Sequence, residues 1–107
     1  MGLLSLLKTK DINAGVETFQ AIKGAVLLDV RTAEEYTEGH IEESLNLPLQ
    51  NIEQVVSIIK DKETPLFVHC RSGGRSATAT AALKQMGYTN VNDIGGILSY
   101  KGKVVKE

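Results

Sequence analysis

The sequence has little of what often stabilises or anchors small proteins, with one cysteine, two prolines and no tryptophan in 107 residues. A single cysteine excludes an intramolecular disulfide and a CxxC redox pair, and a free thiol suits a reducing compartment. We predict neither a metal site nor a cofactor. No apolar run approaches the roughly 18 residues of a membrane span, and the N-terminus lacks the basic and apolar regions of a secretory leader. We therefore expect a cytoplasmic location.

Neither sign of charge is in excess, because 12 basic and 13 acidic residues give a net charge of -1. This balance argues against a general nucleic-acid or anionic-membrane binder, which needs a basic surplus. Only three of the basic residues are arginines, and two of them, Arg71 and Arg75, lie within five residues of Cys70. Since arginine is suited to planar, multi-donor binding of anions, its placement beside the thiol indicates an anion site.

Short apolar runs at 25–30 and 65–70 are typical of strands buried on both faces. Weaker strand candidates are 45–49 and 91–94, and residues 4–7 are a candidate first strand. Alternation of these runs with amphipathic segments predicts right-handed βαβ units. We therefore expect a single α/β domain over 1–107, with a mainly parallel five-stranded sheet and helices on both faces.

Helices are predicted between the strands from apolar spacing and end signals. They are a first helix from Ile12 to Phe19 after Asp11, a short helix opened by a Thr32–Glu35 capping box and ended by Gly39, a helix over 52–60 capped by Asn51, and a helix over 76–86 ended by Gly87. Gly15 is expected to weaken the first of them.

Cys70 ends the second strong strand, and six residues then lead into a helix: Arg71-Ser72-Gly73-Gly74-Arg75-Ser76. Ligands of parallel sheets bind beyond the carboxyl ends of the strands. Paired glycines let backbone N–H groups turn inward, and a helix N-terminus beside them favours an anion. We therefore predict that the pKa of the Cys70 thiol lies below its usual value, which makes the thiolate an available nucleophile. The alternative is a buried, inert cysteine before an ordinary turn, which leaves the composition of the loop unexplained.

The two histidines offer no evident general base. His69 precedes Cys70 in the same strand, so the two side chains are expected on opposite faces, and we predict a structural role for His69. His40 follows Gly39 and is predicted to hold the connection over 39–46.

The segment from Cys70 to Ser76 resembles the active-site loop of rhodanese-like domains, the sulfurtransferase family. Four earlier segments match that family in order and spacing: 28–31, 35–36, 39–41 and 45–48. Gly95-Gly96 resembles its closing turn, with Tyr100 where many members have tryptophan. One departure is the sequence Glu42-Glu43-Ser44, where the family usually has Pro-Gly-Ala.

The resemblance implies that Cys70 is the catalytic nucleophile. It would accept a sulfane sulfur from thiosulfate, a low-molecular-weight persulfide or a protein persulfide, and pass it to a second nucleophile. The implied substrate-binding residues are Arg71, Ser72, Gly73, Gly74, Arg75 and Ser76. Their N–H groups would cradle the transferred sulfur, Arg71 would meet the donor's anionic group, and Arg75 would add charge or brace the loop. Asp29 and Arg31 would support the site, or form a bridge that only stabilises the fold.

Two other functions fit the same residues. A non-enzymatic sulfur-relay or docking module would present the Cys70 persulfide to a partner protein. A cysteine phosphatase or arsenate reductase would use a similar loop, but those families have Cys-x5-Arg, whereas four residues separate Cys70 from Arg75. The shorter loop is better matched to one sulfur atom than to a tetrahedral oxyanion.

Overall fold

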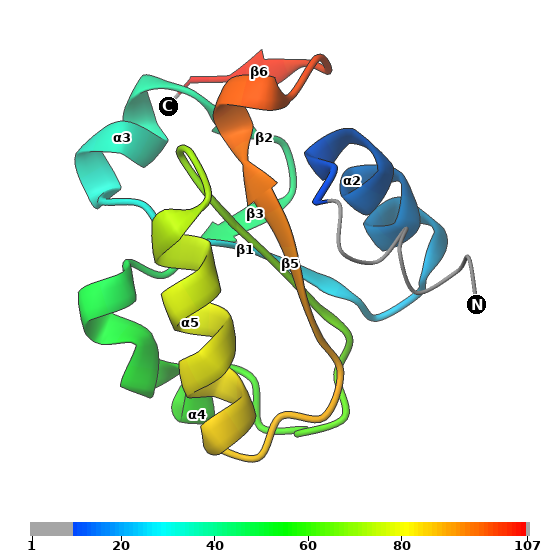
Figure 1. Cartoon of the computed structure of the whole chain (residues 1–107), viewed down its shortest axis with the longest axis vertical. Coiled ribbons are helices and arrows are strands. Elements are labelled where there is room, and N and C mark those ends of the chain that lie inside the picture. The colour runs from blue at the N-terminus through cyan, green and yellow to red at the C-terminus, as the bar shows by residue number, and fades with distance from the viewer. Residues whose placement is uncertain (1–9, 107) are drawn as a thin grey trace.

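The computed structural model describes residues 10–106, and its central layer is a parallel sheet of four strands in the order β3-β1-β4-β5 (Figure 1). The strands are β1 (Val26–Asp29), β3 (Ser44–Asn46), β4 (Leu66–Cys70) and β5 (Val91–Gly96). The predicted parallel α/β sheet is confirmed at these four strands. The candidate strand at 4–7, which would be the fifth, lies outside the described residues.

Helices cover both faces of this sheet, as predicted (Figure 1). Helix α2 (Ile12–Ala21) packs on one face against Leu27 and Phe67, while α5 (Gly74–Gln85) packs on the other against Leu28 and Val68. Successive strand residues thus enter opposite cores, as the alternation of side chains along a strand requires. No helix in residues 10–106 is long and apolar enough to cross a membrane.

Helix ends follow the capping signals of the sequence. The Asp11 side chain accepts hydrogen bonds from the first turn of α2, and Thr32 and Glu35 form a complete capping box at α3 (Ala33–Glu38). Gly87 follows α5 in a left-handed conformation with φ of 102°. These predictions are confirmed. Helix α5 begins at Gly74, two residues earlier than predicted, so the second half of the loop forms its first turn.

The segment after Pro48 differs from the prediction of one helix over 52–60. It forms a 3-10 helix, η1 (Leu49–Gln54), followed by a single α-helical turn, α4 (Val55–Ile58). Asn51 lies inside η1 with φ of -112° and caps nothing, so its predicted N-cap role is wrong. The run is rich in β-branched residues, which have weak helix propensity, and packing of its buried side chains therefore sets the backbone.

A small two-stranded antiparallel sheet joins β2 (His40–Ile41) to β6 (Val104–Val105). No pattern in the sequence predicted this pairing. Near the C-terminal end of the described chain, a further 3-10 turn, η2 (Ile97–Ser99), follows β5.

Glu43, in the turn between β2 and β3, has φ of 74° and is the one non-glycine with positive φ in residues 10–106. It stands where the rhodanese-like domains that the sequence resembles usually have glycine. Side chains in this conformation cost about 1–2 kcal/mol, of which glycine's extra freedom in the unfolded chain offsets a part. Glu43→Gly is therefore expected to raise the free energy of unfolding by about 0.5–1 kcal/mol in urea denaturation.

Gly24→Ala is the matched control, because Gly24 has φ of 86° and no atom lies within 4 Å of the added Cβ. It should lower stability by a similar amount, through strain alone. Lower stability of Glu43→Gly would show that the Glu43 side chain stabilises the turn more than its backbone strain destabilises it.

Candidate functional site

Cys70 lies at the carboxyl end of β4, on the face that α5 covers, and its side chain is buried. The Gly73 N–H donates a hydrogen bond to the sulfur at 3.0 Å. Gly73 adopts a left-handed conformation with φ of 116°, which its lack of a Cβ permits. The loop thus curls back over the sulfur and presents backbone donors to it.

Burial raises the pKa of the Cys70 thiol, but hydrogen bonds of the loop outweigh this effect. The Ser76 hydroxyl and the N–H groups of Ser76, Gly73 and Ser72 favour the thiolate, so the pKa lies below its usual value. The predicted direction is confirmed. The backbone N–H groups act as predicted, the Ser76 hydroxyl is a donor that the sequence reasoning did not name, and Arg75 has a favourable electrostatic interaction with the thiolate.

Arg75 makes a two-pronged ion pair with Glu35 of α3 instead of reaching over the sulfur. The Arg75 Nη1 and Nη2 atoms lie 2.7 and 3.0 Å from the two Glu35 carboxylate oxygens. The hydrogen bond from Arg75 is the main cause that lowers the pKa of Glu35 to about 2. Arg75 therefore braces the loop against α3. Sequence reasoning missed Glu35 as its partner, because the capping box already accounted for that residue.

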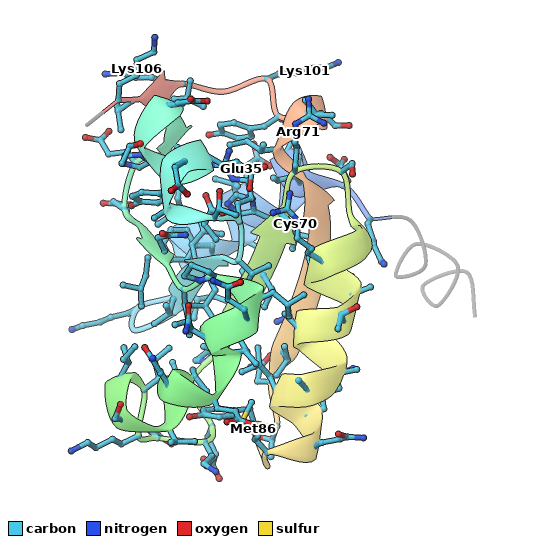
Figure 2. The ribbon with its side chains drawn as sticks, turned by 90° about the vertical axis from the view of Figure 1, so that its left-hand side faces the viewer. Glu35, Cys70, Arg71, Met86, Lys101 and Lys106 are labelled. Atoms are coloured by element: carbon cyan, nitrogen blue, oxygen red, sulfur yellow. The ribbon has the colours of Figure 1, made fainter. Side chains whose placement is uncertain are left out.

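Arg71 is exposed at the mouth of the loop and has no ion-pair partner in residues 10–106. Its side chain lines a shallow hollow of about 160 Å³ with four other residues: Arg31, Glu35, Glu38 and Gly39. Figure 2 shows Glu35, Cys70 and Arg71 at the same end of the molecule. The hollow therefore offers an approach for a small charged molecule beside the cysteine loop.

Asp29 and Arg31 form a buried pair at the end of β1, next to β4 in the sheet. The Arg31 Nε and Nη2 atoms donate to the Asp29 carboxylate at 2.9 and 2.7 Å, and Nη2 also donates to the Gly39 carbonyl at 2.8 Å. These bonds tie β1 to the turn after α3. The pair neither touches the Cys70 sulfur nor presents a free charge to it, so its geometry is that of a brace.

The ring nitrogens of both histidines lie close to backbone carbonyl groups, as in structural histidines. His69 is fully buried on the face opposite Cys70, with Nδ1 3.2 Å from the Cys70 carbonyl and Nε2 3.7 Å from Asp29. Burial is the main cause that lowers its pKa. His40 stacks on Tyr36, and its Nδ1 lies 2.8 Å from the Tyr36 carbonyl, so these contacts link β2 to α3.

Ser76, in the first turn of α5, is fully buried and connects this turn to Asp93 of β5. Its hydroxyl donates to the Asp93 carboxylate at 2.8 Å and lies 3.0 Å from the Gly73 carbonyl, and it also helps to lower the pKa of the Cys70 thiol. Lys10 pairs with the other Asp93 oxygen at 2.8 Å. Sequence reasoning missed Asp93, because only the fold brings residues 76 and 93 together.

Gly96 packs directly against the backbone of the loop that follows Cys70. A Cβ on Gly96 would lie 2.3 Å from the Arg71 carbonyl oxygen and 2.6 Å from the Ser72 Cα. The Leu98 N–H donates to the same Arg71 carbonyl at 3.1 Å. The turn after β5 thus sets the position of the Arg71–Ser72 backbone through a close contact that only glycine allows. Residues 10–106 contain no cluster of side chains suited to hold a metal ion.

Residues 13–103 match the family description "Rhodanese-like domain". The chain belongs to this family. The thiosulfate sulfurtransferase PspE of Escherichia coli is 35% identical over 71 residues, which cover 65% of this chain and 68% of PspE. An adenylyltransferase and sulfurtransferase, uba4, of Ogataea parapolymorpha is 35% identical over 96 residues, which cover 89% of this chain but only 25% of the longer protein.

A solved structure supports the rhodanese-like fold independently. A rhodanese from E. coli, described as containing anions, superposes with a TM-score of 0.72 and 32% identity. The match covers 78% of this chain and 99% of that one. The family resemblance noted in the sequence is therefore confirmed by both kinds of comparison.

The Arg75–Glu35 pair of this rhodanese-like domain predicts a pH dependence of stability. The folded pKa of Glu35, about 2, lies below its ordinary value of 4.5. The pair therefore stabilises the fold above pH 4.5, and this contribution is lost as the pH falls toward 2. Glu35→Gln should lower the free energy of unfolding at pH 7 by on the order of 1 kcal/mol, a modest value because the pair is partly exposed.

Urea denaturation at several pH values measures this effect. The difference in stability between wild type and Glu35→Gln should shrink in acid. Glu34→Gln, at an exposed neighbour that forms no ion pair within the described residues, is the control and should change little at any pH. A pH-independent difference for Glu35→Gln would mean that its charge is not what stabilises the fold.

Proposed function

We propose that this rhodanese-like domain transfers a sulfane sulfur from thiosulfate or a persulfide donor to a nucleophilic acceptor through a Cys70 persulfide. The Cys70 thiolate attacks the outer sulfur of thiosulfate, a new S–S bond forms, and the old S–S bond breaks with its electron pair on departing sulfite. An acceptor such as cyanide or a thiolate then attacks the terminal sulfur, and Cys70 leaves as thiolate. Charge is conserved in both steps, and neither requires an outside oxidant.

The observation that carries this proposal is the set of donors around the Cys70 sulfur. Each step moves negative charge between adjacent sulfur atoms, so stabilisation of anions matters more than a general base. The N–H groups of Ser72, Gly73 and Ser76 already favour the anionic sulfur. His69, the nearest candidate base in sequence, lies on the opposite face of the sheet and bonds to backbone. The relative PspE, whose name specifies thiosulfate, adds support for this substrate.

The rival phosphatase chemistry fits this geometry less well. A Cys-x5-Arg enzyme needs a guanidinium to bind a tetrahedral oxyanion, and the Arg75 guanidinium is engaged by both oxygens of Glu35. We therefore favour sulfur transfer over phosphate or arsenate chemistry. The free thiol also suits a reducing compartment, and we propose the cytoplasm.

Arg71 is proposed to receive the anionic end of the donor, since it lies exposed at the mouth of the loop and pairs with no carboxylate in the described part of the chain. Arg71→Gln should raise the KM for thiosulfate about 5-fold, the effect of losing roughly 1 kcal/mol of attraction at an exposed site. The kcat should change less, because the N–H groups around Cys70 remain. Steady-state kinetics with thiosulfate and cyanide measures both. An unchanged KM would mean that the donor binds without Arg71.

Intact-mass analysis after incubation with thiosulfate or a low-molecular-weight persulfide tests the proposal. We expect one added sulfur atom, removed by cyanide and absent from Cys70→Ser. Loading only from a protein persulfide would favour the sulfur-relay module instead. Absence of loading from all three donors would contradict sulfur transfer.

A further inference from the structure

Ser76 has one hydroxyl proton and three acceptors around it. In the structure the hydroxyl donates to the Asp93 carboxylate at 2.8 Å and lies 3.0 Å from the Gly73 carbonyl, and the Cys70 thiolate, which the hydroxyl also stabilises, is the third. A hydroxyl donates one hydrogen bond, so only one acceptor receives it at a time. When Cys70 is a thiolate, two of the three acceptors are anions, and the buried hydroxyl cannot satisfy both.

Asp93 is held in this position by contacts that do not involve Ser76. The Gly95 N–H donates to the same carboxylate oxygen at 3.0 Å, and Lys10 pairs with the other at 2.8 Å. The Asp93 side chain is only 10% exposed. Its charge is therefore fixed beside the hydroxyl and is only partly screened by solvent.

We propose that Asp93 is a positioning residue that competes with the Cys70 sulfur for the Ser76 proton and so favours the persulfide over the bare thiolate. This inference rests on the proposed function. In the thiolate, the negative charge lies on the Cys70 sulfur, where it needs the Ser76 proton. In the persulfide, the charge lies on the outer sulfur. Donation from Ser76 to Asp93 then removes no hydrogen bond from the charged atom.

The competition with Asp93 is expected to raise the pKa of the Cys70 thiol. Asp93 withdraws a hydrogen bond from the thiolate and adds a nearby negative charge, and both effects oppose ionisation of Cys70. The loop donors lower the thiol pKa, and Asp93 limits how far it falls. A thiolate of higher pKa is a stronger nucleophile, so this limit favours attack on the donor.

The pH dependence of alkylation by iodoacetamide measures the thiol pKa, since Cys70 is the one cysteine of the chain. Asp93→Asn removes the charge while keeping the shape, and should lower the thiol pKa by about one unit. The ratio of persulfide to thiol, measured by intact mass in a fixed mixture of low-molecular-weight persulfide and thiol, should fall about 10-fold.

Lys10→Gln is the matched variant with the opposite expectation. It leaves the Asp93 charge without its cation, so the thiol pKa should rise. Other charged groups that face these residues stay in place: Arg75 near the sulfur, and Asp11 and Lys84 around the hollow beside Asp93. A merely structural role of Asp93 would not move the pKa in opposite directions in these two variants.

Repeating both substitutions with Ser76→Ala identifies the route of the effect. Without the hydroxyl, the shifts should shrink to less than half, because only direct attraction or repulsion remains. Shifts of equal size with and without Ser76, or a raised thiol pKa in Asp93→Asn, would overturn the proposal. The alkylation readout needs no sulfur transfer, so failure of this inference is distinct from failure of the proposed function.

Discussion

Cys70→Ser is expected to abolish sulfur uptake completely while leaving the fold intact. A serine hydroxyl does not ionise at neutral pH, so the loop donors have no anion to stabilise and no nucleophile remains. The side chain is nearly the same size, and the Gly73 N–H that bonds to the sulfur at 3.0 Å finds an oxygen in its place. The free energy of unfolding should stay within about 1 kcal/mol of the wild type.

Thiocyanate production from thiosulfate and cyanide, followed in parallel with urea denaturation, checks both parts. Retention of thiocyanate production by a folded Cys70→Ser protein would contradict the assignment of the nucleophile. If Cys70→Ser is inactive because it unfolds, Cys70→Ala is tested in its place. Alanine leaves no polar group in the buried position, and we expect this variant to fold and to take up no sulfur.

Gly96→Ala is expected to cause the second largest loss. The added Cβ would lie 2.3 Å from the Arg71 carbonyl oxygen and 2.6 Å from the Ser72 Cα, so the loop backbone must move. The N–H groups of this loop are the proposed donors to the transferred sulfur, and displacement by about 1 Å of such groups costs on the order of 100-fold in rate. We expect loading of Cys70 by thiosulfate to fall by about that factor.

Gly15→Ala controls for general overpacking. Its Cβ would lie 2.4 Å from Cγ2 of Ile94, between α2 and β5, so it also crowds a packed contact. It should lower stability by about 1–3 kcal/mol, less any gain in helix propensity, without slowing the loading of Cys70 in the folded protein. Equal loading rates in Gly96→Ala and Gly15→Ala would mean that the position of the loop backbone set by Gly96 does not affect sulfur loading.

The sequence predicted those elements whose causes are local. Asp11 and the Thr32–Glu35 capping box identify helix starts because the bonds join residues two or three apart. The apolar runs that became β1 and β4 identify a buried parallel sheet, because only strands covered on both faces lack polar positions. The arrangement of Cys70 at a strand end before a glycine-rich turn likewise follows from adjacent residues.

Other features depend on residues far apart in the chain. The pairing of β2 with β6 joins segments of two residues each, too short to show a pattern. Arg75 meets Glu35 across 40 positions, and Ser76 meets Asp93 across 17. The backbone donors to the Cys70 sulfur follow from the adjacent glycine-rich loop, whereas the engagement of Arg75 by Glu35 follows only from the fold.

The ionisation of Cys70 tests the central claim most directly. Ultraviolet absorbance of the thiolate, followed through a pH titration of the folded wild-type protein, gives the thiol pKa without any substrate. Donors converging on the sulfur predict a pKa clearly below that of free cysteine, about 8.5. A pKa at or above that of free cysteine would contradict the account, because burial alone would then govern the sulfur.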